Sequence, residues 1–132
     1  MRVMVDMSAT LLHHGHIRIL RKAKEIGTHL TVALTSDEEI LLKKGYTPEL
    51  KYGERAEILL AIKYVDEVVK SPWLLDDDFL NKHEIDLLVH GDDNANDVSE
   101  KKIKIFKRTK EISSHELRRR AKRNFETIIN RL

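Results

Sequence analysis

Short apolar runs alternate with longer helical patterns along this chain of 132 residues. That order is typical of a parallel sheet covered by helices, so we expect an α/β fold with an open parallel sheet of about five strands and helices on both faces. The expected strands cover residues 2–6, 29–35, 65–69, 85–90 and 103–106, and the expected helices cover residues 15–26, 54–64, 76–83 and the tail from 113 onward.

One segment between the second expected strand and the next helix has no clear period. Residues 37–51 mix Lys, Gly and Pro, and we expect them to form a mobile loop that covers a substrate. In open α/β sheets, ligands bind outside the carboxyl ends of the strands, so the residues that follow each strand are the first candidates for a site.

Composition limits the class of protein. With 41% hydrophobic residues, the chain can bury one sizeable core, and we expect a single domain over residues 1–132. The absence of cysteine excludes disulfides, Cys-bound zinc and thiolate nucleophiles. The first residues reach Asp6 with no long apolar segment behind it, so we expect neither a signal peptide nor a membrane span, and a cytoplasmic protein.

Charge is divided unevenly along the chain. Residues 1–100 carry 12 Lys and Arg against 19 Asp and Glu, whereas residues 101–132 carry 12 against 3. A basic end can bind nucleic acid or an acidic partner, or it can be a solvated helix face, and composition leaves these alternatives open. Because the basic helix has little aromatic interleaving, we do not expect nucleic acid to be the partner.

Three histidines follow the first expected strand and run directly into the first helix: His13, His14 and His16, with Gly15 between them. Imidazoles beside the free backbone N–H groups of a helix start form a natural anion site, and a glycine lets a phosphate approach the backbone. Zinc is the rival ligand, but no carboxylate at helical spacing completes a ligand set. The loop therefore predicts a phosphate site.

This loop resembles the HxGH signature of the nucleotidyltransferase superfamily, in particular its cytidylyltransferase branch, which acts on glycerol 3-phosphate, phosphocholine and phosphoethanolamine. The resemblance covers about residues 2–120 and implies the Rossmann-like nucleotidyltransferase fold. Further blocks follow in the family's order: Ser36-Asp37-Glu38, Lys44-Gly45, Glu54-Arg55, Tyr64 to Val68, Pro72-Trp73, Ile85-Asp86, Gly91-Asp92-Asp93, and Arg108-Thr109 with Ile112-Ser113-Ser114.

The resemblance implies a reaction. A phosphate oxygen of a small phosphorylated alcohol, most similar to glycerol 3-phosphate, would attack the α-phosphorus of CTP in line, and pyrophosphate would leave. Mg²⁺ is expected to bridge the phosphates of the nucleotide. The family also implies a homodimer, with residues 64–68 near the subunit interface, although these residues can equally be structural.

The resemblance also assigns roles to residues. Lys44 would close over polyphosphate from its loop, and Arg55 begins a helix, where the dipole opposes a cation, so its position suggests an anionic partner. Ser113 also has a structural role as the N-cap of the last helix, and Trp73 is either a core aromatic or a wall of the acceptor pocket. The expected catalytic residues are His13, His16, Lys44 and Arg108; the nucleotide-binding residues are Met7, Ser8, Gly15, Arg55, Gly91, Asp92, Asp93, Thr109, Ile112, Ser113 and Ser114; the acceptor-binding residues are Trp73 and Lys51; and no protein residue is expected to bind metal.

Two departures from the family pattern leave alternatives open. Met7-Ser8-Ala9-Thr10 stands where the family has Gly-Thr-Phe-Asp or a close variant, and Glu111 stands where it usually has glycine. A weakened nucleotide-binding homologue is one alternative. The other is an adenylyltransferase acting on a sugar phosphate or another phosphorylated metabolite, because Ile112-Ser113-Ser114 followed by Arg118 resembles the ISSxxxR pattern of adenylyltransferases.

Overall fold

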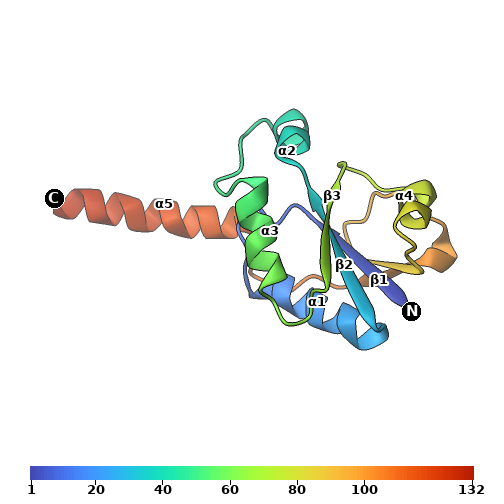
Figure 1. Ribbon diagram of the computed structural model, residues 1–132. Helices are drawn as coiled ribbons and strands as arrows, with labels where there is room; N and C mark the ends of the chain where they lie inside the picture. The colour runs from blue at the N-terminus through green and yellow to red at the C-terminus, as the bar shows by residue number, and fades with distance from the viewer.

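The computed structural model describes residues 1–132 and contains one parallel sheet of five strands. Its order is β3-β2-β1-β4-β5, so the chain first builds outward from β1 to β3 and then returns to the other side of β1 (Figure 1). This arrangement confirms the predicted open sheet. The strands are β1 (Arg2–Met7), β2 (His29–Thr35), β3 (Glu67–Ser71), β4 (Leu87–Gly91) and β5 (Ile103–Phe106).

Helices cover both faces of the sheet, as predicted. Alternate residues of β1 point to opposite faces, so Val3 and Val5 pack in one apolar cluster with Leu20 of α1, whereas Met4 packs in a second cluster with Leu80 of α4. The helices are α1 (His14–Ile26), α2 (Asp37–Lys44), α3 (Tyr52–Leu60), α4 (Asp77–Lys82) and α5 (Ser114–Arg131), with a short 3₁₀ turn, η1 (Glu100–Lys102).

The prediction of a loop over residues 37–51 is wrong for the first half of this segment, because Asp37–Lys44 form the helix α2. Ser36 caps this helix by accepting a hydrogen bond from the backbone N–H of Glu39 at 3.2 Å, and three acidic residues lie in its first turn. Gly45 ends the helix in the left-handed region, with φ 78°, and Ile40 is buried. Local capping therefore forms a helix where the apolar period is too weak to predict one.

The last helix does not pack along the sheet. α5 begins beside the loop that precedes α1 and the segment that precedes α3, and it then extends away from the body, so that its C-terminal end lies at the tip of an arm (Figure 1). All of its residues after Arg118 are exposed. None of the helices combines the length and the apolar character needed to cross a membrane.

Candidate active site

A large open cleft lies at the carboxyl edge of the sheet, where the strand order reverses between β1 and β4. The loop after β1, the first turn of α1, the ends of β4 and β5, and the segment leading into α5 form its walls. The cleft brings together most of the predicted site residues: Met7, Ser8, His13, Gly15, His16, Lys44, Trp73, Gly91, Asp92, Asp93, Arg108, Thr109, Ile112, Ser113 and Ser114. Two predicted residues, Arg55 and Lys51, do not line it.

Two histidines in the cleft are held as neutral N–H donors. His13 is the N-cap of α1, and its Nδ1 accepts a hydrogen bond from the backbone N–H of Gly15 at 3.1 Å. The Nδ1 of His16 accepts from the backbone N–H of His13 at 3.2 Å. Because Nδ1 is an acceptor in both rings, the proton of each neutral imidazole is on Nε2.

Burial keeps these rings uncharged. Burial, together with the nearby His13, lowers the pKa of His16 to about 3, and burial and the charge of His14 lower the pKa of His13. The two ring centroids lie 4.0 Å apart. At neutral pH the cleft therefore presents two adjacent Nε2–H donors.

Gly15 makes room for the His13 ring at the start of α1. A Cβ on Gly15 would lie 2.8 Å from Cε1 and 2.9 Å from Nδ1 of His13. The space that a Cβ on Gly15 would need is thus filled by the His13 ring. Glycine is needed here because it lets the imidazole fold over the start of α1.

A second helix start meets the first in the cleft. Ser113 caps α5 by accepting from the backbone N–H of Glu116 at 2.9 Å. The Ser114 hydroxyl binds both backbone groups of Leu11, donating to the carbonyl at 3.1 Å and accepting from the N–H at 3.2 Å. The positive ends of α1 and α5 are therefore held next to each other, which is favourable for binding anions.

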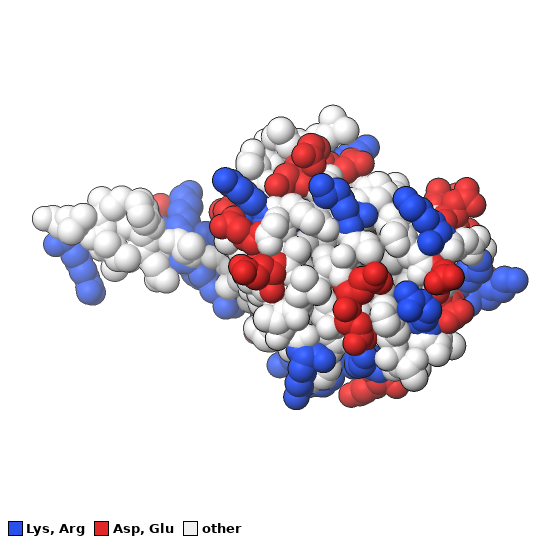
Figure 2. Space-filling view, viewed as in Figure 1, with Lys and Arg blue, Asp and Glu red and all other residues white.

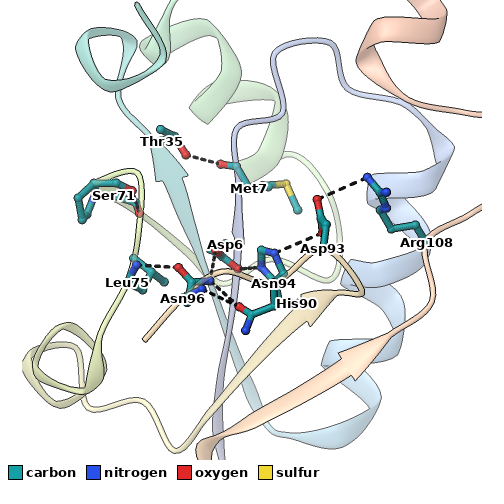
Figure 3. Close-up of polar contacts among 11 residues, drawn as sticks. Asp6, Met7, Thr35, Ser71, Leu75, His90, Asp93, Asn94, Asn96 and Arg108 are labelled. Carbon is teal, nitrogen blue, oxygen red and sulfur yellow. Dashed lines mark hydrogen bonds and ion pairs between the residues drawn. The ribbon is translucent and has the colours of Figure 1, made fainter. Parts of the chain in front are cut away.

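Arg108 lies on the rim of the cleft and is balanced by two carboxylates. Its Nε lies 3.1 Å from Oδ1 of Asp92. Its Nη1 lies 3.4 Å from Oδ2 of Asp93 (Figure 3). A Cβ on Gly91 would lie 3.0 Å from the Asp93 carboxylate and 3.1 Å from Cγ of Arg108, so glycine makes room for this contact. The Arg108 side chain remains 64% exposed, and an incoming phosphate can compete for it.

Sequence reasoning missed a polar network at the base of the cleft, formed by Asp6, His90 and Asn96 (Figure 3). One carboxylate oxygen of Asp6 is bonded to Nδ1 of His90, and the other accepts from Nδ2 of Asn96 at 2.9 Å. Asn96 also accepts from the backbone N–H of Leu75 at 2.7 Å. Asp6 and His90 lie in the last part of neighbouring strands, which is a signal available in the sequence, whereas Asn96 lies in irregular structure and gives no such signal.

The charges around His90 favour its protonated form. Burial by itself would lower the pKa of this imidazole, but the hydrogen bond to Asp6 and the negative charges of Asp6 and Asp93 outweigh both burial and the nearby Arg108, and they raise the pKa. Nε2 of His90 lies 3.4 Å from Oδ1 of Asp93. A line of alternating charges therefore runs from Asp6 through His90 and Asp93 to Arg108.

Arg55 has an internal role in this structure. Its side chain is fully buried; Nε donates to the Leu50 carbonyl at 3.1 Å, and Nη1 donates to the carbonyls of Ser8 at 2.6 Å and Thr35 at 3.0 Å. Nη2 pairs with Asp37 at 2.6 Å. The anion that we expected Arg55 to meet is thus a carboxylate of the same chain, and the guanidinium positions the loop after β1.

The segment between α2 and α3 is tied to the start of α5. Glu49 accepts two hydrogen bonds from Arg118, at 2.6 Å and 2.7 Å, and the Arg118 guanidinium lies 4.8 Å from the ring centroid of Tyr46. At the end of α2, Nζ of Lys44 lies 5.6 Å from the centroid of Trp73. All of these side chains line the cleft, so this segment forms one of its walls.

The segment that departs from the family pattern, residues 7–10, lines the cleft. Ala9 and Thr10 are buried, and Ala9 has a positive φ of 46°. Thr35 donates to the Met7 carbonyl at 3.3 Å, so the backbone after β1 is fixed through its carbonyls. His, Asp and Glu side chains form no group of three that could hold a metal ion.

Comparison with known proteins places residues 9–120 in a family described as cytidylyltransferase-like. Over 97 residues the chain is 39% identical to the ethanolamine-phosphate cytidylyltransferase of Arabidopsis thaliana, an alignment that covers 70% of this chain and 23% of the plant protein. It is 40% identical over 95 residues to the glycerol-3-phosphate cytidylyltransferase of Staphylococcus aureus, covering 70% of each protein. It is 38% identical over 93 residues to the FAD synthase of Thermococcus kodakarensis, covering 70% of this chain and 62% of that enzyme.

A solved structure supports the fold. The lipopolysaccharide core biosynthesis protein of Thermoplasma volcanium matches with a TM-score of 0.69 at 21% identity, over 83% of this chain and 98% of that protein. The chain spans only about a quarter to two fifths of the length of the first ethanolamine- and choline-phosphate cytidylyltransferases that it matches.

Proposed function

Since the chain belongs to the cytidylyltransferase-like family, we propose that it transfers a CMP group from CTP to a small phosphorylated alcohol, most similar to glycerol 3-phosphate, and releases pyrophosphate. The observation that carries the proposal is the pair of neutral Nε2–H donors of His13 and His16, held where two helix N-termini meet in one cleft. This arrangement suits a polyphosphate that gains charge on its oxygens during transfer.

In this mechanism the chain aligns two phosphates and neutralises their charge. A phosphate oxygen of the acceptor forms a bond to the α-phosphorus, the bond between that phosphorus and the α–β bridging oxygen breaks, and pyrophosphate leaves with the electron pair. His13 and His16 donate to the α-phosphate and the leaving group, and Arg108 exchanges Asp92 and Asp93 for phosphate oxygens. Mg²⁺ enters bound to CTP, as part of the substrate, and neutralises phosphate charge there.

The acceptor would bind near Trp73. Lys44, whose Nζ lies 5.6 Å from the centroid of the Trp73 ring in the cleft, would close over the phosphates of the nucleotide. Lys51 lies outside the cleft in this structure, so its predicted role would require a movement of the α2–α3 segment. We also propose that the enzyme acts as a homodimer in the cytoplasm. The family resemblance supports the dimer, and the reducing conditions permitted by a cysteine-free chain are compatible with that compartment.

An adenylyltransferase is the second candidate, and two observations favour it. Arg118 of the Ile112-Ser113-Ser114…Arg118 pattern lines the cleft, and FAD synthases, which are matched at 35–38% identity, are among the relatives. In that function ATP would replace CTP, while the histidine pair and the direction of transfer would stay the same.

The experiment measures pyrophosphate release with Mg²⁺ from CTP and from ATP, across a panel of phospho-alcohols, sugar phosphates and FMN. Release with CTP and a phospho-alcohol is the expected result. A His16→Ala variant should lose two to three decades in rate, or about 3–4 kcal/mol of barrier, because one donor is removed. His16→Gln, whose amide can place an N–H near the position of Nε2, should retain part of the activity.

His29→Ala is the matched control, because His29 begins β2 at the opposite edge of the sheet. It should keep the wild-type rate. Release with ATP alone would favour the adenylyltransferase, and no release with any pair by folded protein would overturn both candidates and leave the weakened nucleotide-binding homologue.

A further inference from the structure

The side-chain amide of Asn96 binds two walls of the cleft at once. Its Oδ1 accepts from the backbone N–H of Leu75 at 2.7 Å, and its Nδ2 donates to the Asp6 carboxylate at 2.9 Å (Figure 3). Nδ2 also donates to Oδ1 of Asn94 at 3.0 Å. The oxygen and both amide hydrogens therefore have partners, and the flipped orientation would place an oxygen against a carboxylate. The two walls fix one orientation of this side chain.

We propose that Asn96 is a positioning residue for the acceptor: through Leu75 it holds Trp73 at a fixed distance from the end of β1. This inference rests on the proposed function, in which the acceptor binds near Trp73. The side chains at both ends of the connection, Trp73 and Asp6, line the cleft, and so does Asn96 itself.

The segment that carries Trp73 is held mainly at its two ends. It begins after Ser71, which ends β3, and it reaches the core again at Leu75, which is 2% exposed. The backbone N–H groups of Trp73 and Leu74 make no hydrogen bond within the chain. The position of the Trp73 ring therefore depends on where Leu75 is held, and Asn96 binds the N–H group at that end.

Burial makes this connection a stiff one. Asn96 is only 9% exposed, and hydrogen bonds in such surroundings are stronger than those in water. Figure 2 shows acidic and basic side chains interspersed over the outer face of the body, where exposed pairs contribute little. A buried amide is therefore better placed than any of these surface charges to set the distance across the cleft.

Loss of the amide would free the acceptor side and leave the nucleotide side in place. Asp6 would keep its bond to Nδ1 of His90. Asp93 would keep its contacts with His90 and Arg108. The effect of replacing Asn96 should therefore fall on the acceptor and on the rate of transfer, with little effect on binding of CTP.

Two variants test this expectation. Asn96→Leu removes the amide at similar volume. Asn96→Asp retains the shape and the acceptor for Leu75, but it places a second carboxylate against Asp6, so the test stands even if Asn96→Leu does not fold. For both variants we expect the KM for the phospho-alcohol to rise, and kcat to fall, by about tenfold or more, because a small misplacement of one reactant is costly. The KM for CTP should stay within about twofold of wild type.

Asn81→Leu is the matched control, because Asn81 is exposed on α4 and its side chain binds only the exposed Lys102. It should keep wild-type constants. If Asn96 only stabilised the fold, its replacement would reduce the amount of active protein and leave the KM of both substrates unchanged, and that result would overturn the inference.

Fluorescence gives a readout that does not need turnover, since Trp73 is the single tryptophan of the chain. Quenching of its emission by acrylamide should increase in both folded Asn96 variants and stay at the wild-type value in Asn81→Leu. Equal quenching in all four proteins would show that Asn96 does not hold this segment.

A wild-type protein that releases no pyrophosphate would contradict the proposed function and leave this inference to an equilibrium measurement. Calorimetric titration with glycerol 3-phosphate then replaces the KM, and the expected result is weaker binding in both Asn96 variants than in wild type and Asn81→Leu. Equal dissociation constants, or no binding by the wild type, would overturn the inference.

Discussion

At the scale of single residues, the chemistry of the cleft depends on backbone groups as much as on side chains. The sequence predicts histidines at a helix start, and this is confirmed. It does not predict that the N–H groups of Gly15 and His13 occupy both Nδ1 atoms, or that burial lowers the pKa of His16 to about 3, because these properties arise only when the loop packs. The tautomer of a histidine therefore depends on its contacts in the folded structure.

Glu111 offers a prediction at this scale. Its φ is +64°, in the left-handed region, where a side chain costs about 1 kcal/mol or more and glycine does not. Glu111→Gly should therefore raise the free energy of unfolding by up to about 1 kcal/mol, after allowing for the greater freedom of glycine in the unfolded chain. Urea denaturation measures this change.

The control for Glu111→Gly is Glu126→Gly, in the interior of α5, where helical φ gives glycine no advantage and a loss of about 1 kcal/mol is expected if the helix unfolds with the body. A lower free energy of unfolding in Glu111→Gly would show that the Glu111 side chain makes a stabilising contact that outweighs its backbone strain.

At the scale of elements, apolar runs that alternate with helical patterns predict five strands in a parallel sheet, and the central strands β1 and β2 are largely buried. They fail for α2, whose only buried residue is Ile40, so that capping at Ser36 and Gly45 decides the structure. They also do not show that Arg55 of α3 binds β2, α2 and the loop after β1. An arginine at a helix start has the same sequence pattern whether its anionic partner is a phosphate or Asp37.

Arg55→Leu tests the internal role of Arg55. Removal of the guanidinium leaves Asp37 without its partner and the carbonyls of Ser8 and Thr35 without donors, so the free energy of unfolding should fall by about 3–5 kcal/mol. Arg55→Lys retains the charge but not the planar set of donors. Its free energy of unfolding should therefore lie between those of Arg55→Leu and the wild type.

Denaturant unfolding of both variants, without nucleotide, gives the measurement. If Arg55→Leu unfolded like the wild type and lost only affinity for CTP, Arg55 would act on the nucleotide as first predicted, and the buried contacts would have little weight.

The pairing of β1 with β4 places Asp6 against His90 and makes stability depend on pH. Because the folded protein raises the pKa of His90 above its ordinary value of 6.5, the stabilisation is fully present below about pH 6.5 and is lost as the pH rises through the folded pKa. The wild type should therefore lose stability as the pH rises above about 6.5. The His90→Gln variant has no titrating side chain at this position, so it should lose less stability over the same pH range.

Denaturation midpoints at several pH values test this difference. His16 does not interfere, because its lowered pKa places its own effect on stability between about pH 3 and 6.5, with stability rising as the pH rises. Equal losses in the wild type and His90→Gln would show that the Asp6–His90 pair does not hold its proton more tightly in the folded state.

At the scale of the whole molecule, the sequence shows that acidic and basic residues are concentrated in different parts of the chain, but it does not show how those parts are arranged in space. Composition shows that residues 1–100 are acidic overall and that residues 101–132 are basic, and periodicity predicts the final helix. Neither indicates that this helix leaves the body after its first turn, because that direction is set by Arg118 with Glu49 and by Ser114 with Leu11, which are contacts between distant parts of the chain.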